Sequence, residues 1–376
     1  MTKRSAWAEV NSKNIEHNLN VIRDAIGKDI RVCAVVKANA YGHGLSGFVN
    51  TLYERKFTDI TAVGKFQELK KVFREVNPDD MDVLLLGAAA PEEIMVALDR
   101  GEIVTRRSIF SVYSQEMLRQ LDEVASYARV TLRAHVRIDI WDSGMGISPE
   151  DFLKDQEQIM TMKHIEVCGL YTHLYTAYSD DLDEIGSELK HFDMMVRNIR
   201  PEYRQRLCIH ALNSPLIFRF PQYAYDMVRA GTALYGLPCK DEGRLKPLMR
   251  ICARIFDVSE VEGKIPLSYL KKDTCGSQRR RIARIMIGYW DLPLMMTQKE
   301  VKIWIKGKLY ELADDVCMDN LCIDINREDD IQVGDLAVLL GEEGVKATDI
   351  LERNNIDPVH AEWMCMTAER LEKVYI

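Results

Sequence analysis

Short apolar runs alternate with longer amphipathic segments through the first two thirds of the chain. The segments between the runs, such as 66–76 and 91–101, repeat apolar residues at helical spacing. A strand–helix alternation of this kind predicts a parallel sheet with crossover helices. Eight runs favour an α/β fold with an N-terminal (β/α)8 TIM-like barrel, although a doubly wound open sheet fits almost as well. The runs lie at residues 31–36, 60–63, 83–86, 103–104, 130–138, 167–171, 207–209 and 227–228.

The pattern changes after about residue 248, where period-two alternation and intervening turn residues predict a mainly antiparallel β domain. The stretch 238–247, PCKDEGRLKP, is polar and contains two prolines and a glycine, which suits a boundary. We therefore expect a barrel over residues 1–240 and a β domain over residues 241–376.

Composition restricts the kinds of partner. The net charge of -8 argues against a broad grip on nucleic acid or on an anionic membrane surface. The N-terminus lacks a long apolar region, and no apolar stretch is long enough to span a bilayer. The nine cysteines show no CxxC pair, and neither they nor the histidines have metal-ligand spacing. We expect a cytoplasmic protein without a metal site.

Lys37 follows the most apolar run of the N-terminal half, in the sequence AVVKANAYGHG. A lysine at the end of a buried strand is unfavourable unless its charge is paired or its pKa falls. A neutral amine in this position would be a nucleophile for a carbonyl cofactor. Residue type alone favours a surface lysine that begins a loop. The following NAYGHG changes this balance, because its glycines, tyrosine and histidine can form a loop that meets a bound anion.

Several motifs in one order resemble the alanine racemase family. The sequence VVKANAYGHG is similar to the family's cofactor-lysine motif, and AWAEVNSKNIEHNL resembles its usual opening. The resemblance continues through CGLYTHL, HALNSP, MVRAGTALYGL, IGYWD and VCMDN, and it covers nearly the whole chain. It implies a barrel followed by a β domain, with pyridoxal 5'-phosphate as cofactor and an amino acid as the small-molecule substrate.

The resemblance also assigns roles to residues. Lys37 would hold the cofactor as a Schiff base and then serve as one proton-transfer base. Arg229 would face the pyridine nitrogen, and because arginine keeps its proton, the ring would be a weakened electron sink. His173 and His210 would orient the arginine and the catalytic tyrosine. The cofactor phosphate would be bound by Tyr41, Asn213, Ser214, the backbone of Gly231, and Thr232.

Tyr289 matches the family's second catalytic base. Inversion of a stereocentre by proton exchange needs acid–base groups on opposite faces of a planar carbanion, and a tyrosine must have its pKa lowered to serve. In the family this tyrosine comes from the partner subunit, so the resemblance implies a homodimer with shared active sites. Met318 and Asp319 match the segment that meets the substrate carboxylate.

Four departures from the family pattern fall at the substrate and phosphate ends of the site. Arg137 occupies the position of a lysine that is often carbamylated. Ile147 falls where an arginine should read the substrate carboxylate, after an insertion of about three residues near 140–142. A charge-assisted contact worth about 1.5–3 kcal/mol is thereby lost, and Arg137 could replace it. Ala361 replaces a tyrosine that contacts phosphate, and Trp290 adds bulk beside Tyr289.

These departures favour a racemase or epimerase that acts on an α-amino acid other than plain alanine. The alternative is a decarboxylase or other carbanion-forming enzyme on the same scaffold, because a weakly held carboxylate leaves more readily. A third possibility is a cofactor-carrying protein with little chemistry of its own, but the retained β domain and Tyr289 argue against it.

Overall fold

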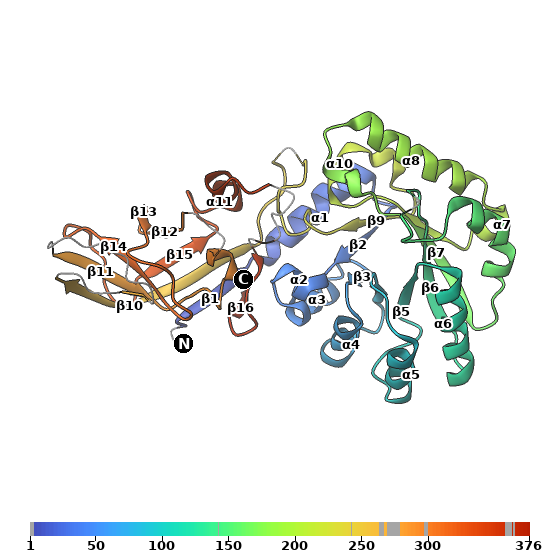
Figure 1. Ribbon diagram of the computed structural model, residues 1–376, viewed down its shortest axis with the longest axis horizontal. Helices are drawn as coiled ribbons and strands as arrows, with labels where there is room; N and C mark the ends of the chain where they lie inside the picture. Colours follow the sequence, from blue (N-terminus) through green and yellow to red (C-terminus); the bar gives the residue numbers. More distant parts are fainter. Residues whose placement is uncertain are drawn as a thin grey trace.

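The chain forms a barrel and a separate β domain that lie side by side along the long axis of the molecule (Figure 1). The computed structural model describes residues 4–141, 143–241, 243–262, 267–268, 279–296, 300–357, 363 and 365–376. Both ends of the described chain lie near the junction of the two parts, where the first and last strands meet (Figure 1).

Eight parallel strands form the barrel in the order β8-β7-β6-β5-β4-β3-β2-β9. Each new strand from β2 to β8 is added on the same side, without the reversal that defines a doubly wound sheet. The ring is closed beside β8, where Asp226 N–H donates to Ile209 O at 3.1 Å and Arg229 N–H donates to Leu212 O at 3.0 Å. The barrel prediction is therefore confirmed. The strands are β2 (Arg31–Val35), β3 (Ile60–Val63), β4 (Asp82–Leu85), β5 (Ser108–Val112), β6 (Leu132–Arg137), β7 (Ile165–Tyr171), β8 (Cys208–His210) and β9 (Met227–Ala230).

One predicted strand is wrong. Residues 103–104 do not pair in the sheet, and the fourth barrel strand in chain order is β5, a few residues later. The carbonyl of Val104 accepts hydrogen bonds from the amides of Arg107 at 2.9 Å and Ser108 at 2.8 Å, which makes this segment a tight turn. Ile103 is nevertheless buried in the core, so its apolar character reflects packing of the turn.

Helices surround the barrel sheet, as expected for crossover connections (Figure 1). Several begin at capping residues: Ser114 Oγ accepts from Met117 N–H at 3.1 Å, and Ser148 Oγ accepts from Asp151 N–H at 3.0 Å. The helices are α1 (Ser12–Ile26), α2 (Lys37–Tyr41), α3 (Leu45–Glu54), α4 (Phe66–Glu75), α5 (Pro91–Asp99), α6 (Gln115–Ala128), α7 (Pro149–Met160), α8 (Leu182–Arg197), α9 (Pro201–Arg204) and α10 (Ser214–Arg219), with the short turns η1 (Tyr175–Tyr178) and η2 (Pro221–Tyr223).

The β domain is built on a second sheet that is antiparallel except for one pairing, between β1 and β16. The strand β1 pairs with β10, so the first residues of the chain, which we expected in the barrel, lie in this sheet instead. The two strands are far apart in the sequence, so the local residue pattern does not indicate that they pair. The elements are β1 (Ala6–Val10), β10 (Met249–Val261), β11 (Arg280–Ile285), η3 (Pro293–Met296), β12 (Lys302–Ile305), β13 (Lys308–Glu311), β14 (Leu321–Ile325), β15 (Leu336–Leu340), α11 (Ala347–Asn354) and β16 (Glu372–Tyr375).

The end of the chain packs against the loop that follows Lys37. Thr367 Oγ1 donates to Gly42 O at 2.7 Å, and the Tyr375 hydroxyl donates to His43 O at 2.9 Å. Gly42 has φ +81°, and a Cβ at this position would lie 1.7 Å from the carbonyl oxygen of Cys365. The two parts of the molecule are therefore joined directly at the loop that bears the candidate cofactor lysine.

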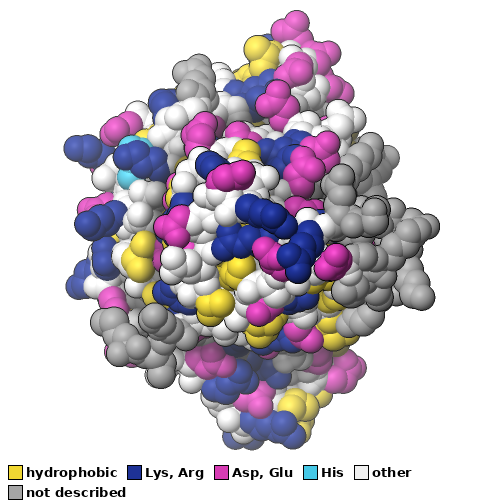
Figure 2. Space-filling model, turned by 90° about the vertical axis from the view of Figure 1, so that its left-hand side faces the viewer, with side chains coloured by type: hydrophobic (Ala, Val, Ile, Leu, Met, Phe, Trp, Pro, Cys, Tyr) yellow, Lys and Arg dark blue, Asp and Glu magenta, His cyan; other side chains and the backbone are white. Residues whose placement is uncertain are grey.

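The far end of the β domain presents charges of both signs. Lys and Arg side chains are interspersed with Asp and Glu across this face (Figure 2). Ion pairs such as Lys306–Asp335 at 2.8 Å and Lys308–Asp329 at 2.7 Å neutralise many of them locally. Within the described part of the chain, no helix combines the length and apolar character needed to cross a membrane.

The contact at Gly42 predicts a stability difference between two glycines. Gly42→Ala should lower the free energy of unfolding by about 3 kcal/mol or more, because the segment at Cys365 must move and the left-handed backbone disfavours a Cβ. Gly27→Ala is the matched control, since its φ is +94° but nothing lies within 4 Å of the added Cβ. We expect a loss of only about 1–2 kcal/mol there. Equal losses in urea unfolding would contradict the proposed contact.

Candidate active site

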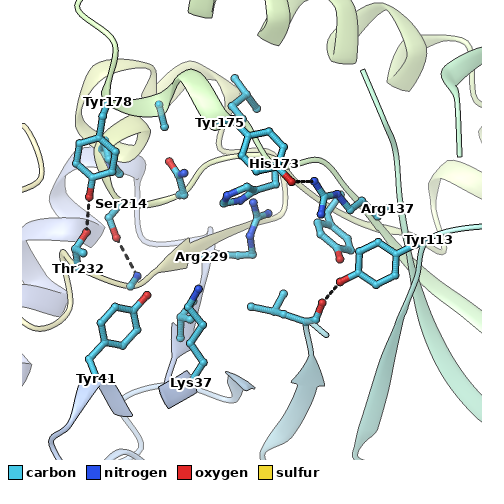
Figure 3. Close-up of a pocket in the computed structure, with 18 residues that line it drawn as sticks. Lys37, Tyr41, Tyr113, Arg137, His173, Tyr175, Tyr178, Ser214, Arg229 and Thr232 are labelled. Carbon is cyan, nitrogen blue, oxygen red and sulfur yellow. Dashed lines mark hydrogen bonds between the residues drawn. The ribbon is translucent and has the colours of Figure 1, made fainter. Parts of the chain in front are cut away.

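A cavity of about 450 Å³ opens at the carboxyl ends of the barrel strands, where barrel enzymes place their chemistry. Tyr178 and Thr232 lie at one end, Arg137 and Tyr113 lie at the other, and Lys37 reaches in between them (Figure 3). The described residues that line it include three cations and no aspartate or glutamate. They are Val35, Lys37, Tyr41, Leu86, Tyr113, Arg137, Tyr171, His173, Leu174, Tyr175, Ala177, Tyr178, Asn213, Ser214, Pro215, Arg229, Gly231 and Thr232.

Lys37 is followed by a backbone turn of left-handed conformation. Residues 38–41 are not glycines, yet their φ angles are 53°, 57°, 54° and 50°, in the left-handed region. Each such residue costs about 1–2 kcal/mol relative to the right-handed form. Strain of this kind persists only where surrounding contacts hold it, and it concentrates at functional sites.

Glu68, at the start of α4, supplies much of that support. Its Oε1 accepts from Asn39 N–H at 3.1 Å, and its Oε2 accepts from Gly64 N–H at 2.9 Å. The Asn39 side chain in turn accepts from Leu45 N–H at 2.8 Å. A Cβ on Gly64 would lie 3.1 Å from Lys37 Cβ, so the lysine stem passes over bare backbone. The carboxylate thus ties the left-handed turn to the next strand of the barrel.

One end of the cavity is shaped to receive an anion. Ser214 Oγ accepts hydrogen bonds from the amides of Gly231 at 2.9 Å and Ala233 at 3.1 Å. With both lone pairs occupied, the serine can offer only its hydrogen to a ligand. A Cβ on Gly231 would lie 2.9 Å from the Tyr41 hydroxyl, so a side chain there would fill the space. The Gly231 amide, expected to meet phosphate, is directed at Ser214 instead.

Arg229, in β9, is buried in the cavity floor. Its Nη1 donates to His210 Nδ1 at 2.8 Å and to His210 O at 3.2 Å. Its Nη2 donates to Thr172 O at 2.8 Å and to Ala211 O at 3.2 Å. These bonds use all four Nη hydrogens and leave the Nε–H for a group in the cavity. Burial lowers the pKa of Arg229 to about 10, so the guanidinium keeps its charge at neutral pH.

A chain of two histidines lies behind Arg229. Because an arginine can only donate, His210 Nδ1 must be unprotonated, and the ring hydrogen must lie on Nε2. His210 Nε2 is 2.9 Å from His135 Nδ1, so it donates to that atom. Burial, together with the Arg229 charge, holds the pKa of His210 well below its usual value, and burial lowers the pKa of His135 to about 3. Both rings are therefore neutral, and their tautomers are fixed.

His173 follows β7 and lines the cavity beside the edge of the Tyr175 ring, with centroids 5.3 Å apart. Burial, and then the nearby charges of Arg229, Arg137 and Lys37, lower its pKa to about 3. A neutral imidazole in this position can accept a hydrogen bond from a group that enters the cavity.

Arg137, at the end of β6, is a buried cation without a counter-ion among the described residues. Its side chain is only 8% exposed, and its Nε has no hydrogen-bond partner in that part of the chain. The Nη2 donates to the Tyr175 hydroxyl at 2.8 Å, and the guanidinium lies 5.6 Å from the centres of the Tyr113 and Tyr175 rings. A buried charge is stable only when it is paired, so this end of the cavity favours an anionic group.

Ile147 does not reach the cavity. Its amide donates to Arg137 O at 2.9 Å, so the backbones of the two residues are adjacent. The Ile147 side chain is buried in the core. Ala361 lies outside the described residues, and Trp290 is 57% exposed. Arg137 is therefore the cation at this end of the cavity, and the adjacent isoleucine packs in the core.

Tyr289 belongs to a tight turn after β11. Its amide donates to Cys317 O at 3.0 Å, and the amide of Trp290 donates to Met318 O at 3.2 Å. A Cβ on Gly288 would lie 2.3 Å from Cys317 O, so only glycine permits this approach. Neither Tyr289 nor Met318 is among the described residues that line the cavity of the same chain.

Arg370 links this turn to the Met318 segment. Its Nε contacts Asp291 Oδ1 at 2.7 Å, and its Nη2 contacts Asp319 Oδ1 at 2.8 Å. Asp291 Oδ2 also accepts from Gly288 N–H at 3.0 Å. The Asp319 carboxylate is therefore paired with Arg370. The contact with substrate that the resemblance implies for this segment involves its backbone N–H groups.

Five of the residues that the structure places in or behind the site are among those that sequence reasoning missed. Tyr175 follows directly on THL after a predicted strand and Tyr178 lies one turn further, and that position at a barrel mouth was a usable signal. The directions of the His135 and Tyr113 side chains depend on strand register, which the sequence does not give. Arg370 contacts the Tyr289 turn although the two are far apart in the sequence. The five are Tyr113, His135, Tyr175, Tyr178 and Arg370.

Comparisons with known proteins agree over the whole chain. A family profile described as "Alanine racemase, N-terminal domain" matches residues 10–238, and one described as "Alanine racemase, C-terminal domain" matches residues 248–375. An alanine racemase of Carboxydothermus hydrogenoformans is 29% identical over 99% of this chain and 100% of its own length. One of Methanococcus maripaludis is 28% identical over 100% of both chains.

Solved structures named alanine racemase are also similar to this chain. The structure named alanine racemase from Clostridium difficile 630 has a TM-score of 0.88 at 29% identity and covers 100% of this chain and 97% of that chain. A Bartonella henselae alanine racemase with covalently bound pyridoxal phosphate has a TM-score of 0.81 at 20% identity, over 99% of this chain and 100% of that chain. At that identity the likeness shows the fold.

The buried histidines predict a pH-dependent stability. The folded state resists protonation of His135, whose pKa falls from 6.5 to about 3, so the unfolded chain binds more protons below pH 6.5. The free energy of unfolding should therefore fall as pH drops from 6.5, by at most about 1.4 kcal/mol per pH unit for each such histidine. Urea unfolding at about pH 7.5 and about pH 5 measures this. His135→Gln should flatten the dependence, and equal wild-type stability at both values would contradict it.

Proposed function

The chain belongs to the alanine racemase family, whose members are pyridoxal-phosphate-dependent amino-acid racemases, and we propose that it racemises an α-amino acid other than alanine by proton exchange between Lys37 and Tyr289. The observation that carries this proposal is the cavity itself, which gathers Lys37, Arg229 and an anion-accepting end at Ser214, with Arg137 at the opposite end.

The residues present fit the cofactor. Bound pyridoxal 5'-phosphate supplies an aldehyde and an electron-withdrawing ring that make the Cα proton of an amino acid acidic. Lys37 Nζ is the amine in the cavity that would hold the aldehyde. Ser214 and Tyr41 direct hydroxyls at the phosphate end, where Gly231 leaves room. Arg229 Nε–H, the one guanidinium hydrogen that its four Nη hydrogen bonds leave, would donate to the ring nitrogen, and this would keep that nitrogen unprotonated and the ring a limited electron sink.

Two bases on opposite sides of Cα exchange its proton. Lys37 Nζ serves one face from within the chain's own barrel. The phenol of the partner's Tyr289 serves the other face, because the turn that carries it does not line the cavity of its own chain. Exposed apolar side chains around that turn support burial against a second copy: Trp290 is 57% exposed and Met318 is 40% exposed. We therefore propose a homodimer with shared sites.

Arg137 binds the substrate carboxylate in this proposal. It is a buried cation at the substrate end, its Nε lacks a partner among the described residues, and its Nη2 donates to the Tyr175 hydroxyl. The decarboxylase alternative depended on a site without a carboxylate-binding cation, and Arg137 supplies one. The described cavity lining also offers no acidic residue to pair with a cationic side chain, which favours substrates whose side chain is neutral or acidic.

Solvent exchange tests the function directly. With purified holoenzyme in D2O and a panel of L- and D-amino acids, we expect deuterium at Cα of both enantiomers. The rate should be highest for a substrate other than alanine, because the substrate end differs from that of an alanine enzyme. Chiral separation with mass spectrometry gives the measurement. At equilibrium, label in one enantiomer only, or release of CO2 without the opposite enantiomer, would contradict racemisation.

Replacement of Arg137 tests its role in substrate recognition. Arg137→Gln should lower kcat/KM about tenfold to hundredfold, as expected for loss of a hydrogen bond to a charged group, while cofactor affinity stays the same. Arg133→Gln is the matched control, because Arg133 lies on the same strand but pairs with Asp82 at 2.9 Å near the opposite end of the barrel. A variant of Arg137 with wild-type kcat/KM would remove it from the substrate site.

A further inference from the structure

The Tyr175 hydroxyl divides its two hydrogen-bonding roles between two neighbours. Arg137 Nη2 lies 2.8 Å from it, and because an arginine can only donate, the tyrosine oxygen is the acceptor in this bond. Figure 3 shows this hydroxyl directed at the guanidinium. Its own hydrogen is directed at Met145 Sδ, 3.6 Å away. The hydroxyl hydrogen is therefore bonded to a thioether sulfur, which is a weak acceptor.

The turn that carries Tyr175 is held from two helices. Thr176 Oγ1 donates to Glu188 of α8 at 2.7 Å, and Arg219 of α10 donates from Nη1 to Ala177 O at 3.0 Å. Tyr175 itself is 57% exposed and lines the cavity. The tyrosine thus extends from a fixed backbone into a space that a ligand can reach, which is what a ligand-binding side chain requires.

Tyr175 adds a donor to an end of the cavity that already favours an anion. Arg137 is buried without a carboxylate partner among the described residues, and its guanidinium lies 5.6 Å from the centre of the Tyr175 ring. A carboxylate bound to Arg137 is within reach of the Tyr175 hydroxyl, because that hydroxyl lies 2.8 Å from Nη2. An ionised oxygen accepts a stronger hydrogen bond than a neutral sulfur does. The hydroxyl hydrogen can therefore turn to such a ligand with a net gain in hydrogen-bond energy.

We propose that Tyr175 is a substrate-binding residue whose hydroxyl turns its hydrogen from Met145 to the carboxylate that Arg137 binds. The proposal rests on the proposed function, because it takes the substrate carboxylate as the anion at this end. Both groups that face the ligand then act as donors, since the arginine keeps its protons and the tyrosine oxygen already accepts from it. A primary amide offers hydrogens in place of one of the two carboxylate oxygens. The pair therefore selects free amino acids over their amides.

Two small ligands of equal size isolate this contact. Dissociation constants of acetate and of acetamide are measured on the protein loaded with pyridoxal 5'-phosphate, from the line broadening of the ligand NMR signals. Tyr175→Phe removes one oxygen atom and should weaken acetate binding about tenfold, with no change for acetamide. Tyr127→Phe is the matched control, because this tyrosine is 73% exposed on α6 and should leave both constants unchanged.

Variants of Met145 separate direct donation from mere support of Arg137. Met145→Gln places an amide oxygen, a stronger acceptor than sulfur, within reach of the tyrosine hydrogen, whereas Met145→Leu offers no acceptor. The glutamine variant should bind acetate about threefold to tenfold more weakly than the leucine variant, because the hydrogen must leave a better partner. Equal affinities would mean that Tyr175 only orients Arg137, and would overturn the donor role.

The outcomes distinguish this inference from the proposed function. If the wild type exchanges deuterium at Cα of an amino acid but Tyr175→Phe binds acetate equally well, this inference alone fails. If the wild type exchanges no amino acid, the proposed function fails and the inference fails with it. A wild type that binds acetate no better than acetamide would refute the carboxylate contact. Equal weakening of both ligands in Tyr175→Phe would also refute it, because a structural defect does not depend on ligand charge.

Discussion

The left-handed turn after β2 fixes where the cofactor amine lies. Four consecutive residues in this conformation are unfavourable by themselves, so the turn exists because other parts of the fold hold it. Glu68 binds it from the next βα unit, and the C-terminal segment closes over Gly42. The position of Lys37 thus depends on both parts of the molecule, which explains why a barrel alone would not define this site.

The charged and hydroxyl side chains divide the cavity into three regions. Arg229 is fixed in the floor by backbone carbonyls and by a neutral histidine pair, so it has one hydrogen left for a ligand. Arg137 occupies one end of the cavity without a counter-ion among the described residues. The other end is lined by the hydroxyl groups of Tyr41, Ser214 and Thr232. A ligand with an anion at each end and a basic ring atom between them satisfies all three regions, and this complementarity is the physical basis of the function that we propose.

The sequence predicted much of this arrangement and missed what depends on distant contacts. Apolar runs indicated the barrel, and rare motifs pointed to Lys37, Ser214 and Arg229, which the structure brings to one cavity. Local pattern placed a strand at 103–104, where a turn packs into the core. The pairing of β1 with β10, and the contact between His135 and His210, join residues far apart in the chain. Periodicity within a window carries no information on such contacts.

The central claim is that Lys37 holds the cofactor covalently, and chemical trapping measures this most directly. The purified protein is supplied with pyridoxal 5'-phosphate, reduced with borohydride, digested and analysed by mass spectrometry. The account predicts one modified peptide, heavier by the reduced cofactor, with the added mass on Lys37. A modification on a different lysine, or no modified peptide from a protein that has taken up cofactor, would contradict it.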